Sequence, residues 1–487
     1  MSKPSLIFTL TSLLLPAYLL GSQTAQDNTF AIEPKKSSIQ ALSLADALEI
    51  LESDNLEIKT AHHDISIAAK DRNIARGYNF GTLDFTQNFA RSNDAGNVFG
   101  FKLSSREATF GDFGFNQFLE PMGQALLGGA LTPADLAGMN SILKIEPKDL
   151  NYPGYRNYHQ SKLTYMLPIF TGGKLDAYGD ISQKMLQMRE LESEQLTTAK
   201  RYELRKSYYD MALVQSSIDN LTTIQGNINQ LEKTTKAMID EGYAKKVDLL
   251  EVEARKSNVE RSLIELEANK KLLYHYISFL LNQEVDNITL PEDDYPLSEI
   301  SENDISINNS DLKRASKGLE ITDKMVDVAY APYLPQVGAF AEVSSSDEKF
   351  MKNLNNHKSY TIGARLSWNL FNGGADYNEL QKAKVQKLKT STQLELAKKG
   401  ILLQYDKIKT EIISLDSQVQ SLQKELELSK QIYKNYEGRY QEHLVSMNDV
   451  IIKQSEQIEK VLKLQKVKND RNERIFELEK LNNGVKK

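Results

Sequence analysis

Side chains suited to chemistry are few and widely spaced in this 487-residue chain. Cysteine is absent, which excludes disulfides, thiolate metal sites and thiol nucleophiles. The six histidines show no metal-ligand spacing, and the adjacent His62 and His63 fit a solvated helix surface better than a metal site. The sequence contains neither a GxxxxGKS/T phosphate loop nor a GxSxG nucleophile elbow. We therefore expect no catalytic residue, no cofactor, no metal and no enzymatic activity.

Two acidic breaks in the helical pattern are the strongest candidates for function. They span residues 241–248 and 442–449 and end in Asp248 and Asp449. Near the start of a helix, an aspartate caps free backbone N–H groups and interacts favourably with the helix dipole. Capping is one interpretation of these two residues, and a role in gating is the other.

Very long helices must position these breaks. A heptad seam with alternating spacings of four and three precedes the second break. It consists of Ile401, Tyr405, Ile408, Ile412, Leu415, Val419, Leu422 and Leu426. About 67 residues separate each glycine pair from the following break, or roughly 100 Å of helix. A return helix of about 35 residues follows each break, at 247–281 and 448–482. A globular core does not need helices of this length.

The two halves of the chain repeat each other. Residues 165–173 recur 201 positions later, and both copies end in a Phe-x-Gly-Gly motif. Leu56 and Ala75 match positions 256 residues later, so about 55 extra residues fall within 91–160 of the first half. We predict a first repeat at 40–282, a polar linker at 283–308, a second repeat at 309–482 and a tail at 483–487.

Each repeat contains one shorter helix and two alternating segments. The helices are expected at 42–78 and 311–330, and the strands at 82–91, 162–170, 336–344 and 361–371. Alternation fits a half-buried soluble sheet, and it also fits transmembrane strands of about 9–11 residues. Four strands cannot close a barrel, and lipid tolerates no open strand edge. Membrane insertion would therefore require eight strands from a dimer or 12 from a trimer.

The first residues predict export. Lys3, an apolar run at 6–20 and small residues after it are typical of a signal peptide, here 1–25. A membrane anchor is the alternative, but the run is short for a spanning helix and Pro16 interrupts it. The net charge of −6 provides no basic surface for nucleic acid.

Together these features resemble the TolC family of outer-membrane efflux proteins over about residues 40–482. The specific motifs are the helix-tip turns, Tyr333-Leu334-Pro335-Gln336, and two strand–helix junctions. The junction residues are Phe170, Gly172 and Gly173, then Phe371, Gly373 and Gly374. The resemblance implies a mainly α protein with transmembrane β structure, in which a homotrimer forms a 12-stranded barrel and a coiled-coil helical tunnel.

The resemblance also implies a function and a location. The barrel would lie in outer-membrane lipid of a Gram-negative bacterium, and the tunnel would cross the periplasm. The chain would be the passive exit duct of a tripartite efflux or type I secretion system. A periplasmic adaptor and an inner-membrane pump would dock at the helical tip and open it.

The same resemblance predicts a periplasmic entrance, or gate, that is held closed by fewer side-chain contacts than is usual in the family. In the family, an aspartate at the position of Asp449 lines the closed entrance, and a Tyr-to-Asp hydrogen bond matches Tyr440 and Asp248 here. A second acid and an arginine latch of the family are replaced by Ile452 and Val445. The turn residues expected to meet the adaptor are Gly242, Tyr243, His443 and Leu444.

Two other functions compete with the duct. A secreted coiled-coil structural protein explains the heptads but neither the glycine junctions nor the strands. A periplasmic adaptor usually carries one helical hairpin, whereas this chain has two. Drug, metal and protein exporters share the duct architecture, so the cargo stays open. The 91–160 loop either caps the barrel or folds back on the tunnel.

Overall fold

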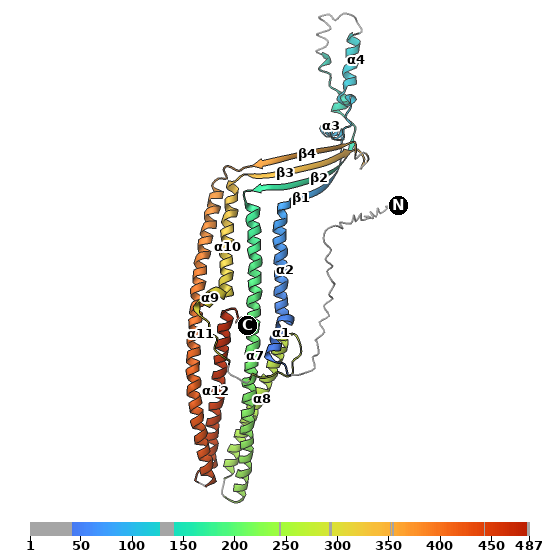
Figure 1. Cartoon of the computed structure of the whole chain (residues 1–487). Coiled ribbons are helices and arrows are strands. Elements are labelled where there is room, and N and C mark those ends of the chain that lie inside the picture. The colour runs from blue at the N-terminus through green and yellow to red at the C-terminus, as the bar shows by residue number, and fades with distance from the viewer. Residues whose placement is uncertain are drawn as a thin grey trace, which may run out of the picture.

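The computed structural model describes residues 41–126, 141–242, 245–291, 295–350, 352, 355–442 and 444–484. The predicted signal peptide at 1–25 lies outside these ranges, as do Tyr243 and His443 of the predicted docking turns. The molecule is elongated, with four strands at one end of two bundles of long helices (Figure 1). Within the described ranges, no helix has both the length and the apolar character needed to cross a membrane.

The two longest helices have the length that the sequence predicts. Helix α7 (Lys174–Asp240) and helix α11 (Ala375–Gln441) each contain 67 residues. Helices α8 (Lys246–Leu281) and α12 (Met447–Leu481) return antiparallel along the half of each that is farther from the sheet (Figure 1). The heptad seam of α11 faces α12: Tyr405, Ile408 and Ile412 are buried against Ile475 and Leu478. The seam therefore holds this helical hairpin together.

Shorter helices cover the sheet-side half of the long ones. Helices α1 (Leu44–Asp54) and α2 (Leu56–Gly77) pack on α7, and α10 (Ser310–Tyr330) packs on α7 and α11 (Figure 1). The single helix predicted at 42–78 is wrong, because Asn55 divides it. The Asn55 Oδ1 accepts a hydrogen bond from the Ile58 N–H at 3.0 Å, and its Nδ2 donates to the Leu280 carbonyl at 2.8 Å. One side chain thus begins α2 and satisfies the end of α8.

The second half repeats this arrangement. Asn309 accepts from the Leu312 N–H at 3.0 Å and donates to the Leu481 carbonyl at 2.9 Å. Asn55 and Asn309 are 254 residues apart, and so are the first residues of strands β1 and β3. The structural offset at the start of the repeats is therefore 254, not the 256 obtained by matching Leu56 and Ala75. The caps mark equivalent positions better than common apolar residues do.

The four predicted strands form one antiparallel sheet in the order β1-β2-β3-β4. They are β1 (Thr82–Ser92), β2 (Arg156–Thr171), β3 (Gln336–Asp347) and β4 (Lys358–Ser367). Strand β4 is shorter than the predicted 361–371 at its end, because its partner β3 begins at Gln336, opposite Ser367. Beyond that point the indole N–H of Trp368 donates to the Tyr333 carbonyl at 3.1 Å. The mainly α fold with a small antiparallel sheet is confirmed.

The insertion between β1 and β2 extends beyond the strands, away from the long helices (Figure 1). Its described elements are α3 (Ala95–Ser104), the 3₁₀ helix η2 (Phe110–Phe113), α4 (Phe115–Leu126) and α6 (Lys148–Asn151). Of the two placements left open by the sequence, the described part of the insertion takes the one that does not fold back on the helices.

The linker crosses the helices between the two halves. Its first part pairs with the chain before α1, through hydrogen bonds from Leu42 N–H to the Asn287 carbonyl and from Thr289 N–H to the Leu42 carbonyl, at 3.1 and 2.9 Å. Its last part forms α9 (Glu302–Asn308), and Ile305 is buried against α11 and α12. The linker therefore completes the apolar cores of both halves.

Candidate functional site

The tip of the first hairpin is a glycine turn followed by a capped helix. Gly242 has φ +80°, a left-handed conformation that favours glycine after a helix end. Helix α8 begins at Lys246, and the Lys245 N–H just before it donates to Asp248 Oδ2 at 2.8 Å. The capping interpretation of Asp248 is confirmed by this contact.

At the tip of the second hairpin, an aspartate likewise caps the start of the return helix. The Ser446 N–H and hydroxyl donate to Asp449 Oδ2 at 3.0 and 2.6 Å, and the Asp449 N–H donates to Ser446 Oγ at 3.2 Å. These hydrogen bonds, the hydroxyl of Ser446 foremost, hold the pKa of Asp449 below its ordinary value. Asp449 therefore caps α12 as a carboxylate at neutral pH.

The two tips lie side by side. Ile451 of α12 is buried against Ile228 and Leu231 of α7 and Val252 of α8. Close to this cluster, Glu232 bridges α7 and α8 by accepting from Lys256 at 3.0 Å and from Lys236 at 2.6 Å. The two lysines lower the pKa of Glu232 to about 2. Packing thus joins the hairpin tips that carry Asp248 and Asp449, and the Glu232 ion pairs hold the two helices of the first hairpin together.

Only part of the predicted gate lies within the described side chains. Leu444 is exposed at the turn, as a docking residue should be. The side chain of Tyr440 lies outside the described part, as do Tyr243 and His443. The hydrogen bond expected between Tyr440 and Asp248 therefore stays a prediction.

The strand–helix junctions require their glycines. Gly172 and Gly173 have φ +67° and +80°, and Gly373 and Gly374 have φ +58° and +79°. Residues with a Cβ rarely adopt this region. At Gly172 the space is also closed, since a Cβ would lie 2.5 Å from the Ala331 carbonyl oxygen. These glycine pairs turn each chain segment from the sheet into a long helix.

The sheet has one apolar and one polar face. Its register aligns large apolar residues across all four strands on one face, in the row Phe85, Leu163, Val343 and Tyr360. These side chains are uncovered in the single chain, and Tyr360 is 79% exposed. The opposite face carries the ion pair between Lys162 and Glu342, with 2.5 Å between Nζ and Oε2. The alternation predicted from the sequence therefore produces two chemically different faces.

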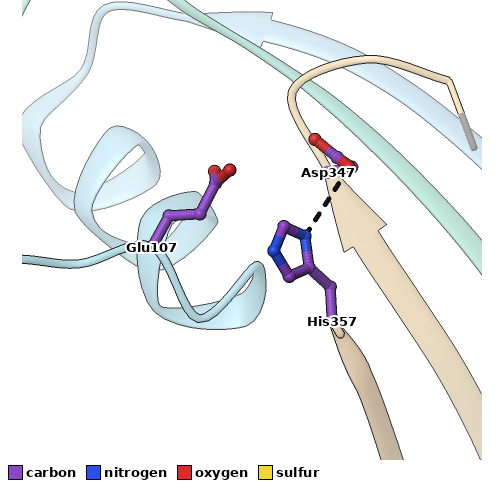
Figure 2. A group of neighbouring side chains, drawn as sticks. All are labelled: Glu107, Asp347 and His357. Carbon is purple, nitrogen blue, oxygen red and sulfur yellow. Dashed lines mark ion pairs between the residues drawn. The ribbon is translucent and has the colours of Figure 1, made fainter. Parts of the chain in front are cut away.

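Sequence spacing missed one group of side chains. Glu107, Asp347 and His357 meet at the end of the sheet farthest from the long helices (Figure 2). They come from three separate segments, so no local motif connects them. A search for ligand spacing cannot find such a group.

Comparisons with known proteins give one family-model match and several similar structures. Residues 303–480 match the family model described as outer membrane efflux protein. No curated protein matches the sequence significantly. The structure is similar to that of CusC, with a TM-score of 0.73 and 11% identity over 93% of this chain and 97% of CusC.

Two further solved structures are outer membrane channels. For CmeC of Campylobacter jejuni the TM-score is 0.72 at 14% identity, over 91% of this chain and 85% of CmeC. For the open state of MtrE of Neisseria gonorrhoeae it is 0.70 at 14% identity, over 97% of this chain and 98% of MtrE. At these identities the likeness shows the fold. The second half of the chain thus contains a region similar to the outer membrane efflux protein family, and the chain as a whole has the fold of these solved channels.

Proposed function

We propose that three copies of this chain form a passive exit duct through the outer membrane and the periplasm. The observation that carries the proposal is the sheet, with an uncovered apolar face and two unpaired edges. Within the described residues, β1 pairs only with β2, and β4 only with β3. Open edges expose backbone donors and acceptors, which lipid cannot satisfy.

Pairing β1 of one copy with β4 of the next satisfies both edges at once. Two copies would give eight strands, and a barrel of that size is filled by its own side chains. Three copies give 12 strands and a wider barrel. A duct therefore needs the trimer rather than the dimer.

The two faces of the sheet suit such a barrel. The row containing Phe85 and Tyr360 would face lipid, and the face with Lys162 and Glu342 would line the lumen. Below the barrel, α7 and α11 would build a tunnel about 100 Å long. The chain shows no nucleotide-binding motif, so partners would supply the energy for export.

The helical tips are the proposed entrance. Three copies would gather the Asp248 and Asp449 carboxylates around one axis, and the exposed turn at Leu444 would meet a periplasmic adaptor. In this proposal an inner-membrane pump and the adaptor open the entrance by moving the hairpins apart. Each aspartate would serve both as a helix cap and as part of an acidic ring.

The first test compares two lysine substitutions on neighbouring residues of β4. Ile362→Lys places a charge on the lipid face, where a central lysine costs about 2–4 kcal/mol, and Thr361→Lys places the same charge on the lumen face. We expect the parent and Thr361→Lys to be extracted from outer membranes with the mass of three chains. Ile362→Lys should insert poorly, whereas Thr361→Lys should change the ion selectivity of the channel.

A soluble monomer or dimer of the parent, absent from the membrane fraction, would contradict the duct. The helical hairpins would then serve a periplasmic coiled-coil or adaptor protein. Equal insertion of both lysine variants would contradict the assignment of the two faces.

The second test concerns the latch. Tyr440→Phe removes the hydroxyl proposed to hydrogen bond to Asp248, and Tyr433→Phe, one heptad earlier on α11, is the matched control. We expect Tyr440→Phe to raise single-channel conductance and the uptake of large solutes, and Tyr433→Phe to leave both unchanged. Parent-like values for Tyr440→Phe would show that this latch is absent.

A further inference from the structure

Three ionisable side chains converge where the insertion meets the end of the sheet (Figure 2). Glu107 follows α3, Asp347 is the last residue of β3, and His357 directly precedes β4. Asp347 is 6% exposed and His357 is 8% exposed, so both side chains are removed from water. The group therefore joins three chain segments in a largely dry site.

Two atoms at the centre of this site have no hydrogen-bond partner among the residues that the structure describes. They are Nδ1 of His357 and Oδ2 of Asp347, and both are buried. They lie 3.6 Å apart, which exceeds the usual 2.7–3.2 Å of a hydrogen bond. Buried polar atoms are nearly always satisfied, so this pair calls for a further partner between them.

The separation fits two ligands of one metal ion. Zinc binds histidine nitrogen and carboxylate oxygen at about 2.0–2.2 Å with tetrahedral geometry, so neighbouring ligand atoms lie about 3.4 Å apart. The observed 3.6 Å is close to this value. The ligand atoms of all three residues lie within 4.8 Å of one another, so the Glu107 carboxylate would need to move closer by at most about 1.4 Å.

We propose that Glu107, Asp347 and His357 bind a divalent cation of the zinc type. One imidazole nitrogen and two carboxylate oxygens suit zinc, whereas calcium and magnesium prefer shells made of oxygen alone. A water molecule would complete the four ligands. The expectation of no metal, drawn from sequence spacing, did not consider ligands from three segments.

The surrounding side chains orient the ligands. The Arg156 guanidinium and the Ser105 hydroxyl hydrogen bond to Glu107 Oε2, which leaves Oε1 for the cation. The Lys349 N–H donates to Asp347 Oδ1 at 3.3 Å, which leaves Oδ2. Such contacts to the second oxygen are typical of metal-binding carboxylates.

The local charge also favours a dication. With a neutral imidazole, the two carboxylates contribute −2, and Arg156 reduces the total to −1. Glu348 lies 4.0 Å from Arg156 and adds a further negative charge beside the site. Arg156 alone therefore leaves the group with a net negative charge, whereas a bound dication would bring that charge close to zero.

The cation would fasten the insertion to the β3–β4 end of the sheet. The binding site itself does not depend on the proposed duct. If the duct is also correct, three cations would encircle the end of the barrel farthest from the helices and hold the insertions in place there.

Zinc binding to the tag-free mature chain, purified in detergent and freed of metal with a chelator, tests the proposal. We expect one Zn²⁺ per chain in competition with a chromophoric chelator. His357→Ala should weaken the affinity by on the order of 100-fold or more, and Glu107→Gln by roughly tenfold. His63→Ala, at an exposed histidine of α2, is the matched control and should bind as the parent does.

X-ray absorption at the zinc edge gives an independent readout. The spectrum should show nitrogen and oxygen ligands with the scattering of one imidazole, and His357→Ala should lose the imidazole signal. If that variant does not fold, the isosteric Asp347→Asn decides, since circular dichroism can show that its fold is intact. Lack of stoichiometric Zn²⁺ binding by the parent, or parent-like affinity in a folded Asp347→Asn or His357→Ala, would overturn the proposal.

Discussion

Glu479 offers the sharpest test of what joins the two halves of the chain. Its carboxylate is 3% exposed and lies on α12. It accepts from Arg205 of α7 at 2.6 Å and from the Ser298 hydroxyl of the linker at 2.6 Å. One carboxylate therefore connects the second half, the first half and the linker between them.

The substitution Glu479→Gln keeps the shape and removes the charge. Removing one partner of a buried ion pair costs about 3–5 kcal/mol, because the other charge loses its compensation. Arg205 is still 24% exposed and keeps part of its hydration. We therefore expect Glu479→Gln to lower the free energy of unfolding by about 3 kcal/mol, near the lower limit of this range.

The assay is denaturant unfolding in detergent, followed by far-ultraviolet circular dichroism. The control is Glu477→Gln on the same helix, whose partner Arg474 is 37% exposed. A pair this exposed contributes less than about 1 kcal/mol. Unfolding of both variants at the same denaturant concentration, with equal slopes, would refute the role assigned to Glu479.

Three further predictions concern the glycine junction, the shared cap and the tip. Gly173→Ala should lower the free energy of unfolding by about 1–2 kcal/mol, because alanine would be held in a left-handed conformation. Gly172→Ala should lower it by roughly 1–3 kcal/mol more, because its Cβ would also clash with the backbone, and equal melting temperatures of the two variants would contradict this. Asn55→Ala should lower the free energy of unfolding, measured with denaturant, by about 2 kcal/mol: about 1 kcal/mol for the lost helix cap and about 1 kcal/mol for the Leu280 carbonyl left unpaired. The stability of Asn55→Asp should lie between that of Asn55→Ala and that of the parent. The pKa of Glu232 is lowered from 4.5 to about 2, so its contribution is complete above pH 4.5 and is lost as the pH falls through 2. Amide exchange at the tip should therefore be faster in Glu232→Gln than in the parent at pH 6 and equal to it below pH 2; a constant ratio would contradict the assignment.

Local periodicity made the long elements predictable. The heptad seam of α11 requires only that apolar residues recur along one helix, and the glycine pairs require only a left-handed backbone. The break at Asn55 was missed for the opposite reason. A single asparagine is a weak signal inside a helical pattern, and the carbonyl that it satisfies belongs to Leu280, far along the chain.

Strand ends depended on neighbours rather than on their own residues. Strand β2 begins at Arg156, before the predicted 162, although its added residues are mostly polar. They are strand because they pair with β1 from Arg156 onward and also with β3 from His159 onward. The helix caps at Asp248 and Asp449 were predictable from position alone, whereas the proposed gate would depend on contacts between copies of the chain.

The equal length of α7 and α11 has a mechanical consequence. Each helix starts at a glycine pair and ends at a turn, so its residue count sets how far its tip reaches. Removing one residue from α7 alone would retract that tip by about 1.5 Å and rotate it by about 100° relative to its neighbour. The buried contact between Ile451 and the first hairpin would then be out of register. The lengths of α7 and α11 are therefore coupled, and only an equal change in both helices would keep their tips at the same height.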